Sequence, residues 1–134
     1  GTVYFLRGEY DEALEFGTLG LKYAKEHNYL YRVAICLNNI GGVFWHRGNL
    51  DGAKDYYEES LEIRRKIHDQ RGIASTLNNL GTISAMQENF ILANDYWQQG
   101  LKIAQELGVK ILVAFILNNL GAVNRDIRQF GRFS

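Results

Sequence analysis

Apolar residues recur at helical spacing over two neighbouring segments of the chain. The first runs from about Leu30 to Arg47, and its apolar positions are Val33, Ile35, Cys36, Leu37, Ile40, Val43 and Phe44. This spacing follows a period of roughly 3.6 residues, which indicates an amphipathic helix. Gly48 and Asn49 interrupt the pattern, and because glycine suits a helix C′ position and asparagine an N-cap, we expect one helix to end and another to begin there. The period resumes from Asp51 to Ile67, with charged residues on the opposite face. The pattern therefore predicts two consecutive helices.

This pattern returns at a spacing of 40 residues. The phrase Leu37-Asn38-Asn39-Ile40-Gly41 is followed by Leu77-Asn78-Asn79-Leu80-Gly81 and by Leu117-Asn118-Asn119-Leu120-Gly121. A fixed period of this size is typical of stacked supersecondary units rather than of a single globular core. We expect an all-α fold, an α-solenoid of stacked antiparallel helix pairs. Its approximate units are residues 1–28, 29–68, 69–108 and 109–134, of which the first and last are partial, so we interpret the chain as a piece of a longer array.

Composition and charge narrow the choice of partners and compartment. The chain has 134 residues, of which 46% are hydrophobic and none is proline, so it can bury a core and form long helices. Fifteen basic residues balance fifteen acidic ones without a basic stripe, so we expect neither nucleic acid nor a membrane as a partner. No apolar stretch approaches the roughly eighteen residues of a membrane span. Cys36 is the only cysteine, which favours a reducing compartment and a cytoplasmic location.

Candidate catalytic chemistry is missing from the sequence. The histidines and Cys36 lack metal-ligand spacing, and the carboxylates are scattered over helix faces without a paired arrangement. Gly41-Gly42 sits inside a helical pattern, where it cannot form a phosphate loop. Cys36 lies among apolar residues and is interpreted as a buried structural thiol. We therefore expect no enzymatic activity, no metal and no cofactor.

The repeated columns resemble the tetratricopeptide repeat in its longer, 40-residue form. The residues of the second unit that carry the resemblance are Leu37, Ile40, Gly41, Phe44, Gly48, Leu50, Ala53, Tyr57 and Ser60-Leu61. In the first unit Gly8 matches the turn glycine, whereas Ser84 and Glu88 depart from the aromatic and turn positions of the third unit. Asn124 and Arg128 depart from them in the fourth. The repeated Leu-Asn-Asn-Leu-Gly motif is also similar to repeats of the LGN/Pins polarity adaptors, kinesin light chains and bacterial signalling proteins.

The resemblance implies where a ligand would bind. In this family the first helix of each pair lines the concave face of a right-handed superhelix, and the matching inward positions include Ser75 and Phe115. The residues we expect to line a peptide groove are Asn38, Asn39, Asn78, Asn79, Asn118, Asn119, Trp45, His46, Phe5 and Met86. An amide offers both a donor and an acceptor to a peptide backbone. The second asparagine of each pair matches the position at which the family commonly contacts its ligand.

Two alternatives stay open at these positions. One asparagine of each pair can instead bond to the neighbouring repeat and set the stacking, and Trp45 can be a packed aromatic. A clamp for a terminal carboxylate is not expected, because no Lys or Arg occupies the matching inward sites before Arg125.

The sequence supports two hypotheses of different classes. The first is a protein-interaction scaffold that binds an extended peptide or a partner helix in its groove. The second is a structural spacer or self-association element of a larger, bacterial-type signalling or regulatory protein. Under the second hypothesis homo-oligomers form through uncapped terminal helices.

Overall fold

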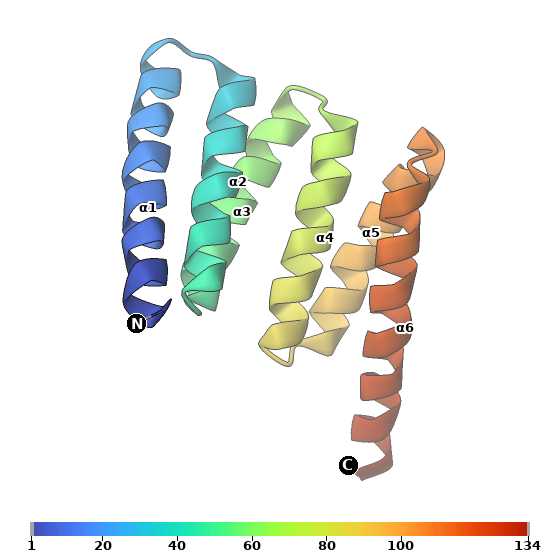
Figure 1. Ribbon diagram of the computed structural model, residues 1–134. Helices are drawn as coiled ribbons and strands as arrows, with labels where there is room; N and C mark the ends of the chain where they lie inside the picture. The colour runs from blue at the N-terminus through green and yellow to red at the C-terminus, as the bar shows by residue number, and fades with distance from the viewer. Residues whose placement is uncertain (1, 134) are drawn as a thin grey trace. The chain divides into compact units, whose positions relative to one another are not determined.

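The computed structural model describes the backbone of residues 2–133 and the side chains of residues 8–128. Over this range the chain forms six helices and no strand. They are α1 (Thr2–Glu26), α2 (Leu30–His46), α3 (Leu50–Lys66), α4 (Gln70–Met86), α5 (Phe90–Leu107) and α6 (Lys110–Phe133). They divide into two compact units, residues 1–67 with α1 to α3 and residues 68–134 with α4 to α6 (Figure 1). The all-α class predicted from the periodicity is confirmed.

The helix boundaries follow from local turn chemistry. Gly48 has a φ of +83°, a left-handed conformation that glycine adopts without steric cost, and it separates α2 from α3. The side chain of Asn49 then caps α3 by accepting a hydrogen bond from the amide of Gly52 at 2.9 Å. The cap predicted from the sequence is therefore confirmed. Asp69 and Asn89 cap α4 and α5 in the same way.

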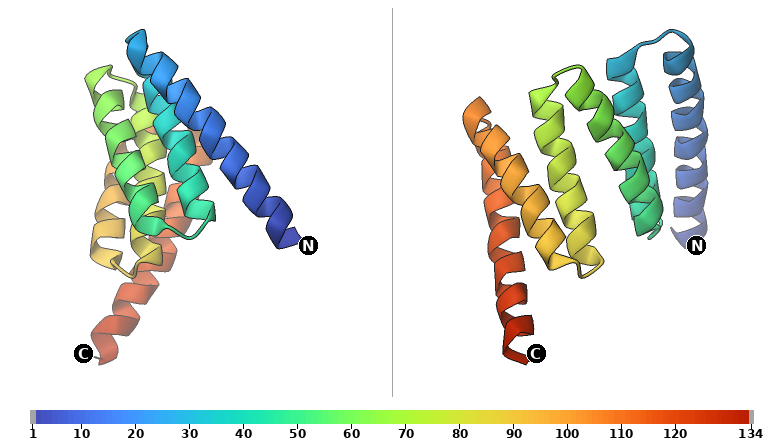
Figure 2. Two further views of the ribbon diagram at one scale, coloured as in Figure 1. Left: turned by 90° about the vertical axis from the view of Figure 1, so that its left-hand side faces the viewer. Right: turned by 180° about the vertical axis from the view of Figure 1, so that it is seen from behind.

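In the first unit, α2 runs antiparallel to both α1 and α3 (Figures 1 and 2). Small residues allow the helices to approach closely. The ring of Tyr57 on α3 covers Gly41 on α2, where a Cβ atom would lie 3.1 Å from the ring. Ser60 donates a hydrogen bond from its hydroxyl to the carbonyl of Ala34 at 2.8 Å. Small residues therefore lie where α2 and α3 approach each other most closely.

The second unit repeats this arrangement with a larger aromatic. The indole of Trp97 on α5 lies over Gly81 on α4, and its Nε1 donates a hydrogen bond to the backbone carbonyl of Asn78 at 3.1 Å. The apolar core between α5 and α6 contains Ala93, Trp97, Ala104, Ile116, Leu120 and Val123. The helix α5 connects α4 to α6 and runs antiparallel to both, so α4 and α6 run in the same direction within this unit (Figure 2).

Two sequence-based expectations need correction. The turn expected at Gly8 is absent, because α1 continues through this residue to Glu26. Gly48 is followed by Asn49, whose side chain caps α3, whereas Gly8 is followed by Glu9, which is not a favoured N-cap residue. The thiol of Cys36 is only half-buried, since it lies beside Gly20 at the contact of α1 with α2.

At its other end the chain also passes a family turn position without bending. The helix α6 continues through Arg128, which replaces the turn glycine, and extends beyond the ends of α4 and α5 (Figure 1). The assignment of repeat units to residues 1–28, 29–68, 69–108 and 109–134 stays a prediction. Among the helices described, none has the length together with the hydropathy that a membrane crossing requires.

Candidate functional site

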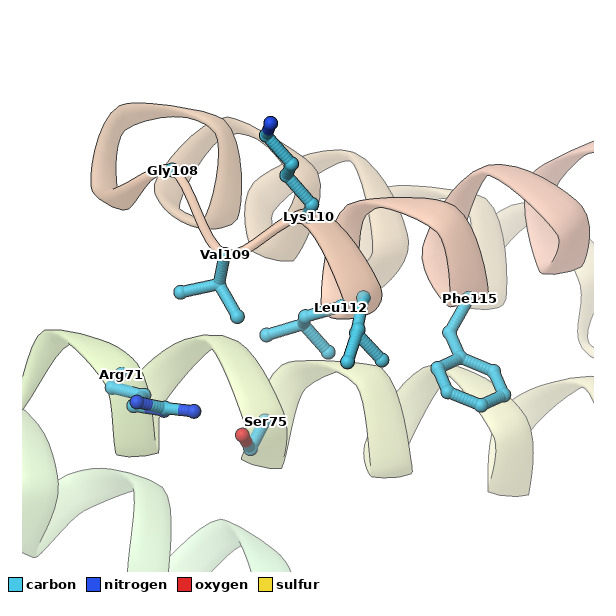
Figure 3. Close-up of a pocket in the computed structure, with 8 residues that line it drawn as sticks. Arg71, Ser75, Gly108, Val109, Lys110, Leu112 and Phe115 are labelled. Atoms are coloured by element: carbon cyan, nitrogen blue, oxygen red, sulfur yellow. The ribbon is translucent and has the colours of Figure 1, made fainter.

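A cleft opens between the beginnings of α4 and α6 in the second unit (Figure 3). Its volume is about 470 Å³. The residues that line this α4–α6 cleft are Arg71, Ser75, Gly108, Val109, Lys110, Ile111, Leu112 and Phe115. Arg71 and Ser75 belong to α4, and the others belong to the α5–α6 turn and the first turns of α6. The cleft is thus formed by α4 and α6, the helices that carry the second and third copies of the repeated phrase.

The sequence of α6 explains why the cleft wall is apolar. Ile116, Leu120 and Val123 are buried in the core with α5, so they fix which face of α6 points into the core. Ile111 and Phe115 lie on a different face and are 74% and 61% exposed. Large apolar side chains exposed together are typical of an interaction surface. The cleft therefore has a wall that a partner could cover.

Positive charge accompanies this apolar wall. Arg71 and Lys110 are the charged residues among the eight that line the cleft, and both are exposed. The Arg71 side chain extends along α4 toward Ser75, and both residues line the cleft, whereas the Lys110 ammonium points away from α4 (Figure 3). Within the part of the chain that the structure describes, neither cation takes part in an ion pair. Arg71 is thus the charge that a ligand in the cleft would meet first.

Asparagines connect the two helices farther along the same surface. Asn119 on α6 donates a hydrogen bond from Nδ2 to Oδ1 of Asn78 on α4 at 3.1 Å. The backbone carbonyl of Asn78 also accepts the bond from Trp97, so this residue links all three helices of the unit. This pair supports the stacking alternative for Asn78 and Asn119. Among the other predicted asparagines, Asn39 and Asn118 are exposed and Asn38 and Asn79 are half-buried.

The predicted aromatic and sulfur positions fall in different places. Trp45 is half-buried in the first unit and stacks on His46 at 5.6 Å, and His46 stacks on Tyr10 at 6.1 Å. Met86 is exposed at the end of α4 in the second unit. Phe5 falls among residues 1–7, whose side chains lie outside the described part of the chain. A ligand role for these four residues stays a prediction.

Sequence reasoning missed Arg71 and Lys110 as candidate site residues. The expectation about cations concerned only the family's inward positions, which include Ser75 and Phe115 but neither Arg71 nor Lys110. A signal was present, since Arg71 precedes Ser75 by four residues and residues at this spacing share a helix face. Over the described residues no group of three His, Cys, Asp or Glu side chains could hold a metal ion.

Comparisons with known proteins place this architecture in a family. The chain matches the family model of the tetratricopeptide repeat over residues 1–66 and 32–106. Among curated protein sequences, none matches. The crystal structure of BtubC (BKLC) from P. vanneervenii is similar with a TM-score of 0.80 and 28% identity, over 92% of this chain and 52% of that one.

The apo form of RapI is similar with a TM-score of 0.76 and 29% identity, over 81% of this chain and 39% of that one. The chain therefore spans about half the length of BtubC and less of RapI. These similarities confirm the helical-repeat solenoid class, and they support a protein-interaction scaffold. A closer relation to LGN/Pins-type repeats stays a prediction. The family model covers well over half of the sequence, and the chain belongs to the tetratricopeptide repeat family.

Proposed function

We propose that this chain binds an extended peptide or a partner helix on the surface shared by α4 and α6. The observation that carries the proposal is the α4–α6 cleft, where Ile111 and Phe115 are exposed beside Arg71. Aromatic anchors and arginine are enriched among residues that contribute most of the binding energy of interfaces. A partner that covers Phe115 would gain from burial of its ring.

Asparagines extend this surface beyond the cleft. Asn79 and Asn118 offer amide groups that can pair with a peptide backbone whatever its side chains are. The bond between Asn78 and Asn119 holds α4 and α6 at a fixed spacing before any ligand arrives. Such preorganisation lowers the entropic cost of binding. In the first unit we propose that Asn38, Asn39, Trp45 and His46 make corresponding contacts.

A structural spacer or self-association element is the second candidate. The observation that favours it is the face of α6 that carries Ala114, Leu117 and Gly121. Leu117 is 51% exposed, whereas its equivalent in α4, Leu77, is 0% exposed because α5 covers it. A helix from a second copy that packed there would bury a comparable stripe. Light scattering across a range of protein concentrations tests this candidate, which requires that the wild-type chain associates and that Leu117→Glu stays monomeric.

We also propose a compartment and a parent protein for this chain. We place the chain in the cytoplasm, as one part of a larger signalling or regulatory protein, because its single thiol suits a reducing compartment.

The first experiment is a random-peptide display selection against the purified chain. The variant with Asn39, Asn79 and Asn119 changed to Ala serves as counter-selection. We expect a shared motif that is enriched by the wild type and lost with the variant. An absence of enrichment from a folded, monodisperse sample would contradict the peptide groove and favour the spacer.

Melting temperatures separate ligand contact from stacking. Asn39→Ala should leave the melting temperature nearly unchanged, because its side chain is exposed. Asn119→Ala removes the bond to Asn78, which is worth about 1 kcal/mol, so its melting temperature should fall by a few degrees. If Asn39→Ala abolishes peptide binding without a change in melting temperature, this asparagine contacts the ligand.

A further inference from the structure

We propose that the α4–α6 cleft binds an acidic peptide segment with a bulky apolar side chain. A carboxylate of the segment pairs with Arg71, and the apolar side chain packs against Phe115 and Ile111. This inference rests on the proposed function and deepens it, because it names the chemical class of the partner.

Charge complementarity is the first argument. The eight residues that line the cleft include two cations and no anion, although the whole chain carries fifteen residues of each sign. The positive charge is therefore a local property of the cleft. A partner that covers Ile111 and Phe115 would also shield Arg71 from water, which strengthens the attraction of Arg71 for an anion. A neutral or basic segment would leave this attraction unused.

The geometry of Arg71 and Ser75 is the second argument. Arg71 and Ser75 are one helical turn apart on α4 and both line the cleft, and the Arg71 side chain extends along α4 toward Ser75 (Figure 3). A guanidinium presents paired N–H donors that match the two oxygens of a carboxylate. The hydroxyl of Ser75 can donate a further hydrogen bond to the same group. Lys110 points away from α4, so it contributes long-range attraction only.

The apolar wall is the third argument. Phe115 and Ile111 belong to the first turns of α6 and stay exposed in a cleft of about 470 Å³. That space admits a large side chain beside the backbone that carries it. Because Arg71 and Phe115 stand on facing helices, one short segment can reach both.

The repeat itself shows that this cation is specific to one place. The positions equivalent to Arg71 are Tyr31 and Ile111, and those equivalent to Ser75 are Ile35 and Phe115. The pair of cation and hydroxyl therefore occurs once among the repeats. We expect a single acidic contact in the ligand rather than a charge at every repeat interval.

The test uses the peptide most enriched by random display on the intact chain. It is synthesised with both ends capped and a fluorescent label, alongside an analogue in which Asn and Gln replace Asp and Glu. Fluorescence anisotropy gives the affinity of both peptides for the wild type, Arg71→Gln, Phe115→Ala and Lys102→Gln. Lys102→Gln is the matched control, since Lys102 is an exposed cation on α5 outside the cleft.

We expect Arg71→Gln to lower the affinity for the acidic peptide at least about tenfold, because a charge-assisted contact is lost. Phe115→Ala should weaken it similarly, and Lys102→Gln should leave the affinity unchanged. The uncharged analogue should bind the wild type as weakly as the acidic peptide binds Arg71→Gln, and should lose nothing more in that variant. Arg71→Lys, which keeps the charge without the paired donors, should give an intermediate affinity.

Other results would distinguish a failure of the acidic-partner inference from a failure of the proposed peptide binding. Enriched peptides that are neutral or basic, or that bind Arg71→Gln as tightly as wild type, would overturn the acidic partner and leave the peptide groove standing. A folded, monodisperse chain that enriches no peptide would overturn both. Because Arg71 is exposed, its variants should have the same melting temperature as the wild type. An unchanged melting temperature shows that a lower affinity comes from the lost contact and not from unfolding.

Discussion

Tyr57 in the first unit is a buried residue whose side chain can lose a proton. Its side chain is 2% exposed, and its ring occupies the space that Gly41 leaves open. Burial disfavours the charged phenolate and raises the pKa of Tyr57 above its usual value of 10.0. The folded chain therefore keeps this proton at a pH where the unfolded chain has begun to lose it.

This difference predicts how stability depends on pH. Below a pH of about 9 both states hold the proton, so Tyr57 makes the free energy of unfolding neither rise nor fall. Above a pH of about 10 the unfolded state loses it first, and the free energy of unfolding should fall as the pH rises. Urea unfolding at pH values of about 7 and 10.5 measures the fall, which Tyr57→Phe should reduce. Tyr23→Phe, at an exposed tyrosine, should leave it unaltered, and an equal slope in wild type and Tyr57→Phe would contradict the account.

The asparagine pairs show what sequence can predict at this scale. The repeated phrase predicts that Asn78 and Asn119 lie on separate helices, and they lie on α4 and α6. It leaves open which amide bonds to its neighbour, because residues adjacent in sequence point about 100° apart on a helix and the choice depends on how two helices approach. The bond from Asn119 to Asn78 supports stacking for this pair. Ligand contact at the remaining asparagines stays a prediction.

Helix pairs depend on a glycine that faces an aromatic ring. Gly41 faces Tyr57, and Gly81 faces Trp97. Gly121 occupies the same column on α6, and nothing lies within 4 Å of where its Cβ would be. The column therefore provides a covered position and an open one in the same sequence context.

Alanine substitutions at Gly81 and Gly121 should change the free energy of unfolding in opposite directions. At Gly81 a Cβ would lie 2.5 Å from Nε1 of Trp97, so Gly81→Ala must separate α4 from α5 and strain the bond to Asn78. We expect a loss of about 2–3 kcal/mol in the free energy of unfolding. Gly121→Ala meets open space inside a helix and should gain about 0.5–1 kcal/mol. Urea denaturation of both variants measures the difference, and changes of the same sign would refute the packing role of the column.

Helix ends are predictable where the turn itself specifies them. Gly48 and Asn49 supply a left-handed residue and a cap, and the boundary between α2 and α3 falls there. Gly8 matches the same family position, yet α1 continues through it. A glycine permits a turn without enforcing one, and the residue after it decides whether a new helix is capped there: Asn49 caps α3, whereas Glu9 follows Gly8.

The α4–α6 cleft escaped prediction for a different reason. Arg71 and Lys110 line the same cleft only because α5 lies between their helices in sequence and returns α6 beside α4 (Figure 2). Helical periodicity describes one element at a time. The approach of two elements is a long-range property that depends on core packing, here by Ile116, Leu120 and Val123.

At the scale of the whole molecule, stability should be distributed along the chain. Within each unit the helices pack mainly on their neighbours in sequence, α1 on α2 and α2 on α3, then α4 on α5 and α5 on α6. In repeat proteins of this kind, stability approximates a sum of local units and nearest-neighbour terms. A local defect should therefore loosen its own surroundings most.

Hydrogen exchange of the Gly81→Ala variant tests this distribution. The strain between Gly81 and Trp97 lies inside the unit of residues 68–134, so the amides of α4 and α5 should exchange faster than in the wild type, and those of α6 should follow. The amides of α1 and α2 should change least, since their neighbours in the first unit are intact. Gly41→Ala provides the mirror experiment, with the fastest exchange expected in α2 and α3. A uniform increase from α1 to α6 in both variants would show a single cooperative unit and contradict the local account.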